Sequence, residues 1–203
     1  MIYKHRSTTP NWLHQHPNLN TDALPVIQKE LIQLFEQSKH LHLDPYITVS
    51  RWIPLSLEQS KNYCPILMQE LDRLGLQKIF IGVAFVSVVG AQTFGMHVDN
   101  DDDIGLNIPL LNCSGTYTVW YDCKFVPPFT KWLNDPHIDN IHKYTEIDRI
   151  EANVPYWINT NVLHQPVATH NNFRLAASLR FNPTPLDHNG QLWPHLVASD
   201  LEE

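Results

Sequence analysis

Residues 156–181 read YWINTNVLHQPVATHNNFRLAASLRF, with His164 near the centre of the stretch. Upstream, residues 90–112 read GAQTFGMHVDNDDDIGLNIPLLN and contain His97 and Asp99, one residue apart. Side chains alternate between the two faces of a β-strand, so His97 and Asp99 are expected to point the same way. They would present one imidazole and one carboxylate to a single metal ion. A distant strand would supply His164 as the third ligand.

Such a set predicts a mononuclear iron site. Two histidines and one carboxylate on one face of an octahedron leave three positions open, which suits Fe(II) that binds a chelating cosubstrate together with O2. Arg174 follows His164 by ten residues and is the predicted partner of the cosubstrate's far carboxylate. A guanidinium is permanently charged and can bind a carboxylate through two hydrogen bonds. Ser178 and Arg180 share strand parity with Arg174, so all three can face one side of a regular strand.

The His97 triplet is selected over two competitors. The chain holds three His-x-Asp triplets, whereas roughly one is expected by chance. The triplet that begins at His42 would take His97 as its distal ligand, but Asn107 stands ten residues beyond His97 where a cation is needed. The triplet that begins at His137 precedes His164 by only 27 residues, a short span for the strands that separate ligands in such sites. Only the His97 set is complete.

Length and cysteine content indicate one domain in a reducing compartment. At 203 residues the chain can bury one core and is short for two domains. Cys64, Cys113 and Cys123 form no metal-type pair spacing and are predicted to be reduced thiols. The first 17 residues have no apolar segment of signal-peptide length, and no window approaches the ~18 apolar residues of a membrane span. We therefore expect a soluble, cytoplasmic protein with no membrane partner.

The net charge of -7 disfavours nucleic acid as the main partner, because nucleic-acid binding depends on Lys and Arg that neutralise phosphates. A small-molecule or peptidyl substrate is the expected partner. The sequence does not predict the oligomeric state.

The pattern of the chain is helical in its first third and strand-like afterwards. Apolar spacing predicts helices over residues 22–40 and 57–74, with a break or late start at Pro65 and a stop at Gly75. A long insertion over residues 124–144 resists assignment as a strand, and such loops are often lids. Many short strands indicate a mainly β sandwich or barrel. Strands are predicted at residues 46–53, from 78 to about 89, and at 92–99, 104–111, 116–121, 147–154, 156–159 and 173–181.

Both quoted stretches resemble a known family. The stretch 90–112 resembles the first ligand region of the 2-oxoglutarate and Fe(II)-dependent dioxygenases, and 156–181 resembles the second. Phe94 matches the Gly-x-x-Phe-x-x-His-x-Asp pattern of prolyl hydroxylase-like members, although Ala91 stands in place of the glycine. The run from Phe173 to Leu175 is similar to the aspartyl/asparaginyl hydroxylase branch, in which Arg follows the distal His by ten residues. The branch stays open between these two.

The resemblance covers about residues 78–182 and implies a double-stranded β-helix, which is a jelly-roll or cupin-like barrel, with N-terminal packing helices. The single domain 1–203 would comprise a helical support region at 1–77, the jelly-roll core at 78–182 and a tail at 183–203. The implied activity is a hydroxylase that uses Fe(II), 2-oxoglutarate and O2 to oxidise an unactivated C–H bond. An amino-acid or peptidyl side chain is the preferred substrate.

The resemblance also implies roles for residues. His97, Asp99 and His164 would ligate iron and form the catalytic centre. Arg174 would pair with the C5 carboxylate of 2-oxoglutarate, with Ser178 assisting and Arg180 as the fallback anchor. Further donors to the cosubstrate would come from Asn107, at its C1 end, and from Thr118, Trp120 or Tyr121 on a neighbouring strand.

Two other functions remain open from the sequence. A cupin-type isomerase or hydrolase would use the same three ligands with another ion and no cosubstrate, and Arg174 would then contact the substrate. A non-catalytic β-sandwich binding module would hold at most a structural metal.

Overall fold

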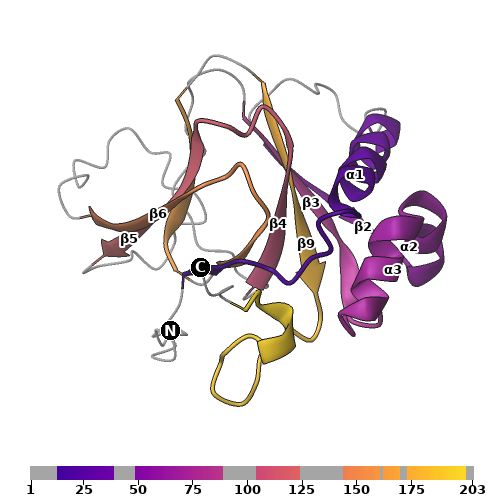
Figure 1. The fold of residues 1–203 in the computed structure, drawn as a ribbon. Coiled ribbons are helices and arrows are strands. Elements are labelled where there is room, and N and C mark those ends of the chain that lie inside the picture. Colours follow the sequence, from indigo (N-terminus) through magenta and orange to yellow (C-terminus); the bar gives the residue numbers. More distant parts are fainter. Residues whose placement is uncertain are drawn as a thin grey trace, which may run out of the picture.

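The framework of the fold is a pair of antiparallel sheets (Figure 1). The computed structural model describes residues 13–38, 49–88, 104–123, 144–160, 162–169 and 173–199. Within them the larger sheet has the strand order β1-β7-β4-β9-β3-β2 and the smaller sheet the order β6-β5-β8. The strands are β1 His14–Gln15, β2 Val49–Pro54, β3 Phe80–Val88, β4 Ile104–Leu111, β5 Thr116–Cys123, β6 Tyr144–Glu151, β7 Tyr156–Asn159, β8 His164–Ala168 and β9 Arg174–Phe181.

Three helices cover one face of the larger sheet (Figure 1). They are α1 Leu24–Ser38, α2 Leu57–Tyr63 and α3 Pro65–Arg73, and a short 3-10 helix at Pro194–Leu196 follows the last strand. Apolar side chains of α1 and α3 form one core with those of β3, β4, β7 and β9. The helices therefore pack outside the barrel, as the sequence predicted.

Strand β9 is buried on both faces along its whole length. Leu175, Ala177, Leu179 and Phe181 belong to the core under the helices. The alternate residues Arg174, Ala176, Ser178 and Arg180 face the other way, since successive side chains of a strand point to opposite faces. On that face Ser178 is paired in register with Asn107 of β4, and Asn107 with Tyr156 of β7. Tyr156 contacts Thr118 of the smaller sheet, so this face is the barrel interior.

Several predicted elements are confirmed to within two residues at each end. The helix predicted at 22–40 is α1, and the strands predicted at 104–111 and 156–159 are β4 and β7. The break predicted at Pro65 is present: α2 ends at Tyr63 and α3 begins at the proline, which is favoured in the first helical turn because it lacks an N–H. After α3, Gly75 adopts a φ of 70° as the helix stop.

Other predictions need correction. The strand predicted at 147–154 is β6, Tyr144–Glu151, because Asn153 and Pro155 lie in the turn that follows it. Strands β1 and β8 were not predicted, since both are short, and Pro166 interrupts the β-branched pattern of β8. The predicted strand 92–99, residues 124–143 of the predicted insertion, and residues 46–48 of another predicted strand lie outside the described residues.

Helix α3 takes the cap for its first turn from another helix. Its N-cap residue, Cys64, makes no side-chain capping hydrogen bond. The carboxylate of Glu30 on α1 instead accepts hydrogen bonds from the backbone N–H groups of Ile66, at 2.9 Å, and Leu67, at 3.0 Å. These N–H groups have no partner inside the helix, so a buried Glu30 satisfies donors that would otherwise be orphaned.

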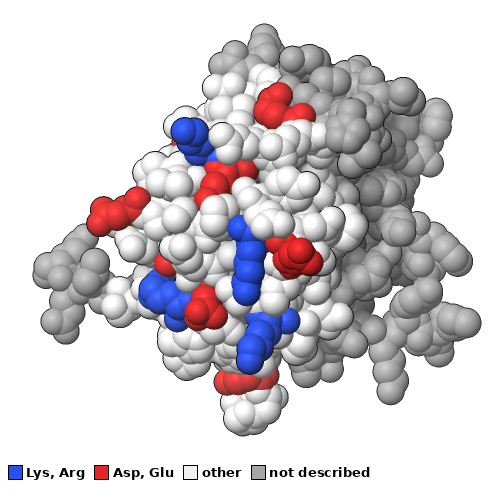
Figure 2. All heavy atoms as spheres, turned by 90° about the vertical axis from the view of Figure 1, so that its right-hand side faces the viewer, with Lys and Arg blue, Asp and Glu red and all other residues white. Residues whose placement is uncertain are grey.

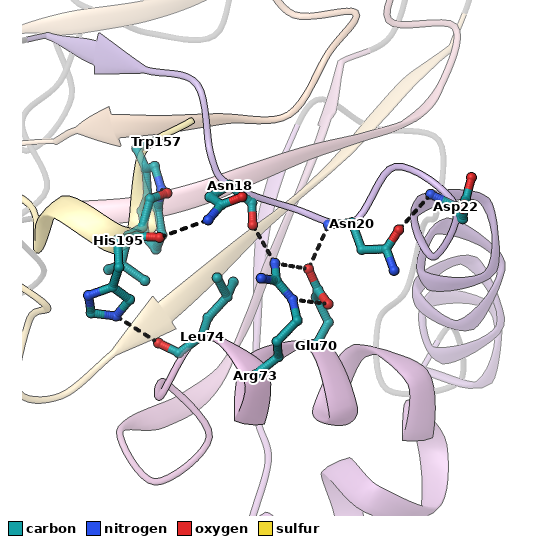
Figure 3. Close-up of polar contacts among 9 residues, drawn as sticks. Asn18, Asn20, Asp22, Glu70, Arg73, Leu74, Trp157 and His195 are labelled. Atoms are coloured by element: carbon teal, nitrogen blue, oxygen red, sulfur yellow. Dashed lines mark hydrogen bonds and ion pairs between the residues drawn. The ribbon is translucent and has the colours of Figure 1, made fainter. Parts of the chain in front are cut away.

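A second polar link joins α3 to the segment before α1 (Figure 3). Arg73 donates to both carboxylate oxygens of Glu70, at 2.7 and 2.9 Å, and to the backbone oxygen of Asn18. Glu70 also accepts from the backbone N–H of Asn20 at 2.7 Å. Burial alone would raise the pKa of Glu70, but the hydrogen bonds from Arg73 and Asn20 outweigh it and leave that pKa lowered.

The described part of the predicted tail packs against the same region (Figure 3). Asn18 donates from its side chain to the backbone oxygen of His195 at 3.1 Å, and the His195 ring contacts the backbone oxygen of Leu74 at 3.2 Å. The indole of Trp157 donates to the backbone oxygen of Leu196, whose side chain is fully buried. The residues after β9 thus cover the core beside the C-terminal end of α3.

The outer surface carries mixed charge over the helices. Figure 2 shows this face, on which Lys and Arg side chains stand beside Asp and Glu side chains. None of the helices in the described ranges has the length and apolar character required to cross a membrane.

We predict that Glu30→Ala lowers the free energy of unfolding by about 2 kcal/mol, because two buried N–H groups lose their acceptor. Glu30→Gln should cost less, since its amide oxygen can still accept one hydrogen bond. Urea denaturation would measure both, with Gln33→Ala on the exposed side of α1 as the control. Equal stability of Glu30→Ala and this control would contradict the capping function.

Glu70→Gln should lower the free energy of unfolding by about 1 kcal/mol at neutral pH. The folded-state pKa of Glu70 lies below the ordinary value of 4.5, so its carboxylate stabilises the fold above about pH 4.5 and loses this effect as the pH falls through the folded-state pKa. The difference between wild type and Glu70→Gln should therefore shrink below pH 4.5.

Glu146→Gln is the matched control for this experiment, because Glu146 also pairs with an arginine three residues away but on an exposed strand. Its effect on the free energy of unfolding should stay well below that of Glu70→Gln at neutral pH, because ion pairs at the surface contribute little. Denaturation curves measured across pH 3 to 8 would test this. If the difference in stability between wild type and Glu70→Gln did not change with pH, the Glu70 carboxylate would not stabilise the fold through its hydrogen bonds with Arg73 and Asn20.

Candidate functional site

His164 is a buried histidine on the inner face of the smaller sheet. It begins β8, is 3% exposed, and lies opposite Trp120 of β5 in the strand register. Trp120 packs with Tyr156 and Ile158 of the larger sheet, so this face lies inside the barrel. The Nδ1 atom of His164 is 2.9 Å from the backbone oxygen of Val162. Because a carbonyl oxygen only accepts, Nδ1 carries a proton, and in the neutral ring the lone pair is therefore on Nε2.

This tautomer fits a metal ligand, since ligating histidines commonly donate their other ring N–H to a carbonyl or carboxylate. The other two predicted ligands, His97 and Asp99, lie outside the described residues. Within the described ranges no three His, Cys, Asp or Glu side chains gather into a group that could hold a metal ion. The three-ligand set therefore stays a prediction, to which the structure adds the position and tautomer of His164.

Arg174 places a buried guanidinium inside the barrel. Its side chain is 2% exposed, and its Nε and Nη1 atoms have no hydrogen-bond partner among the described residues. It begins β9 and is paired with Val88 of β3. An unpaired buried charge is costly, which is why buried guanidinium groups are normally matched by an anion. The geometry is that of a cation prepared to bind an anionic group.

Tyr156 joins the two sheets and was not foreseen. Its hydroxyl accepts a hydrogen bond from Nδ2 of Asn107 at 3.0 Å and shares one with Oγ1 of Thr118 at 2.7 Å. The predicted donors Asn107 and Thr118 are therefore brought together through this phenol. The strand periodicity of residues 156–159 placed Tyr156 on one face with Ile158, but nothing in the sequence indicated which strands it would meet.

Ser178 and Arg180 lie against the backbone of β4. A Cβ atom built on Gly105 would lie 2.7 Å from Oγ of Ser178 and 3.2 Å from Nη1 of Arg180. Real Cβ atoms essentially never come as close as 2.7 Å, and 3.2 Å is tighter than most Cβ contacts, so the absence of a side chain at Gly105 makes room for both groups. Ser178 is 3% exposed, and its buried hydroxyl has no hydrogen-bond partner among the described residues. Gly105 was not predicted as part of the site.

The two remaining candidates on β5 are separated by the strand alternation. Trp120 is fully buried in the interior, and its indole lies 5.3 Å from the ring of His14. Tyr121 points to the opposite face, where its hydroxyl donates to Oε1 of Gln165 at 3.2 Å. Burial, with a smaller contribution from Glu146, raises the pKa of Tyr121. Tyr121 is therefore not brought to the candidate site.

Comparisons with known proteins identify the fold. No protein-family model and no curated protein matches the chain. SnoK, a non-heme α-ketoglutarate dependent carbocyclase from nogalamycin biosynthesis, aligns with a TM-score of 0.52 and 8% identity over 83% of this chain and 78% of SnoK. A prolyl hydroxylase from Trichoplax adhaerens, in complex with a hypoxia inducible factor peptide fragment, aligns with a TM-score of 0.45 and 12% identity over 83% and 81% of the chains.

HygX from Streptomyces hygroscopicus, whose structure holds nickel and 2-oxoglutarate, aligns with a TM-score of 0.47 and 10% identity over 85% of this chain and 83% of HygX. At such identities the likeness is one of fold. The predicted fold class is confirmed: the chain has the double-stranded β-helix fold that 2-oxoglutarate-dependent oxygenases adopt.

Proposed function

We propose that the chain is an Fe(II)- and 2-oxoglutarate-dependent oxygenase that hydroxylates an unactivated C–H bond. The observation that carries this proposal is the guanidinium of Arg174, which is buried inside the barrel with Nε and Nη1 unpartnered among the described residues. A dicarboxylic cosubstrate supplies the anion that this cation lacks, and charge-assisted hydrogen bonds to its carboxylate would satisfy the buried N–H groups. The fold supports the same reading, since SnoK is an α-ketoglutarate dependent enzyme.

His97, Asp99 and His164 would hold the metal, with Nε2 of His164 as the ligating atom. The Val162 carbonyl fixes the orientation of the His164 ring before the metal binds. When bound, Fe(II) with 2-oxoglutarate and O2 supplies the oxidising chemistry, in which the cosubstrate becomes succinate and CO2 and a substrate C–H becomes C–OH.

The residues of the chain would bind and orient the reactants. Arg174 would bind the C5 carboxylate, and the closed packing around β9 would exclude water from it. A small-molecule or peptidyl substrate, with an amino-acid side chain preferred, follows from the resemblance of residues 156–181. A reducing, cytoplasmic compartment is consistent with the free, buried thiols of Cys64 and Cys113.

Anaerobic titration of the Fe(II)-loaded protein with 2-oxoglutarate should produce the visible metal-to-ligand charge-transfer band. In Arg174→Ala we expect the dissociation constant for 2-oxoglutarate to rise at least about tenfold, because a charge-assisted pair is lost. Arg149→Ala, on an exposed strand, is the matched control and should titrate like wild type. Bound iron without a band in wild type would favour a cosubstrate-free, cupin-type enzyme or a binding module.

His164→Ala should reduce the Fe(II) bound per chain to a small fraction of the wild-type amount, and His97→Ala and Asp99→Ala should do the same. Open three-ligand sites lose most of their affinity with one ligand. The control is His14→Ala, which removes a partly exposed imidazole that pairs with Asp148 at 3.1 Å. Iron content measured after gel filtration tests this, and full iron in His164→Ala would remove it from the ligand set.

A further inference from the structure

A second polar cluster lies inside the barrel on β4 and β9. It consists of Asn107, Ser178 and Arg180, grouped around Gly105. Asn107 is the register partner of Ser178, and Gly105 is the register partner of Arg180. Nη1 of Arg180 and Oγ of Ser178 both approach the same point above Gly105, so the guanidinium and the hydroxyl lie side by side. Asn107 completes a row of polar groups on one face.

The cluster presents donors and an acceptor in adjacent places. The buried Ser178 hydroxyl has no hydrogen-bond partner among the described residues, and neither does Oδ1 of Asn107. Nδ2 of Asn107 is held by Tyr156, so Oδ1 is turned away from that phenol. A guanidinium beside a hydroxyl suits a carboxylate, whereas a neighbouring amide oxygen suits an N–H or O–H donor.

The cluster is separate from the position of Arg174. Ser178 follows Arg174 by four positions along β9 and Arg180 follows it by six, which correspond to about 13 and 20 Å along a strand. The guanidinium of Arg180 lies against Gly105, its direct neighbour across the sheet, so it does not extend along β9 toward Arg174. One five-carbon dicarboxylate does not span these positions.

We propose that this second cluster binds the primary substrate, and that the substrate is a small α-amino acid. Its carboxylate would pair with Arg180 and Ser178, and its ammonium group would donate to Oδ1 of Asn107. The inference rests on the proposed function, which assigns Arg174 to the cosubstrate. It assigns Asn107, Ser178 and Arg180 to the substrate, in place of the cosubstrate role that the family resemblance implied for them. The cluster faces the same interior as His164, because Asn107 is linked through Tyr156 to Thr118, two residues from the Trp120 that lies opposite His164.

The test uses the full chain loaded with Zn(II), which keeps the complex redox-inert, and saturated with 2-oxoglutarate. Trifluoroacetate serves as a compact carboxylate probe whose binding is read from 19F relaxation. We expect trifluoroacetate to bind in the presence of 2-oxoglutarate, glycine to displace it at lower concentration than acetate, and inorganic phosphate to displace it least. The amino group of glycine gives this advantage through Asn107, so Asn107→Leu should abolish it.

Arg180→Met should weaken trifluoroacetate binding at least about tenfold and leave 2-oxoglutarate binding in place, while Arg174→Met should do the reverse. Ser178→Ala and Gly105→Ala provide smaller changes should Arg180→Met fail to fold, as judged by its thermal unfolding. Ser178→Ala removes one donor, and Gly105→Ala places a methyl group within 2.7 Å of Oγ of Ser178. Both should weaken the probe and spare 2-oxoglutarate.

The inference would be overturned if the probe did not bind once 2-oxoglutarate is saturating, or if phosphate displaced the probe better than glycine. It would also be overturned if Arg180→Met, Ser178→Ala and Gly105→Ala all bound the probe as wild type does. Loss of 2-oxoglutarate binding in Arg180→Met but not in Arg174→Met would also overturn it, by assigning the cluster to the cosubstrate. Absence of 2-oxoglutarate binding in every form would instead overturn the proposed function. Probe binding that still depended on Arg180 would then support the acid site alone.

Discussion

The structure depends on the burial of both faces of β9. One face of this strand supplies apolar side chains to the core beneath α1 and α3, and the other lines the barrel interior. Arg174, Ser178 and Arg180 occupy the interior positions, so a strand at the centre of the fold carries polar groups that desolvation would normally disfavour. The apolar face provides the stability that holds these groups in place. Fold and candidate site are thus two faces of one strand.

The helices and most strands could be predicted because their signals are local. The apolar spacing of α1, the position of Pro65 and the stop at Gly75 each report on a few neighbouring residues. The strands that escaped prediction owe their existence to partners far away. Within the described ranges, His14–Gln15 pairs with β7 and His164–Ala168 pairs with β5, and these long-range pairings define both segments as strands. Tertiary pairing overrides weak local preference in such short segments.

The candidate site shows the same division. Strand parity predicted from the sequence that Arg174, Ser178 and Arg180 share a face, since parity is a local property. The hydrogen bonds of the Tyr156 hydroxyl with Asn107 and Thr118 could not be predicted from the sequence, because they connect strands of two different sheets. The importance of Gly105 was equally hidden: a glycine in a strand gains meaning only from the side chains that approach it. His97 and Asp99 lie outside the described residues, so their role rests on the sequence pattern alone.

The start of α3 also has a consequence for how related sequences should vary. Burial, together with the nearby Glu30 carboxylate, raises the pKa of the Cys64 thiol to about 12. At the N-cap this neutral thiol makes no side-chain capping hydrogen bond, and Glu30 supplies the acceptors. A chain with Ser or Asp at position 64 would carry its own cap and would no longer need an acid at position 30. The residues at positions 30 and 64 should therefore change together among related sequences, although they belong to different helices.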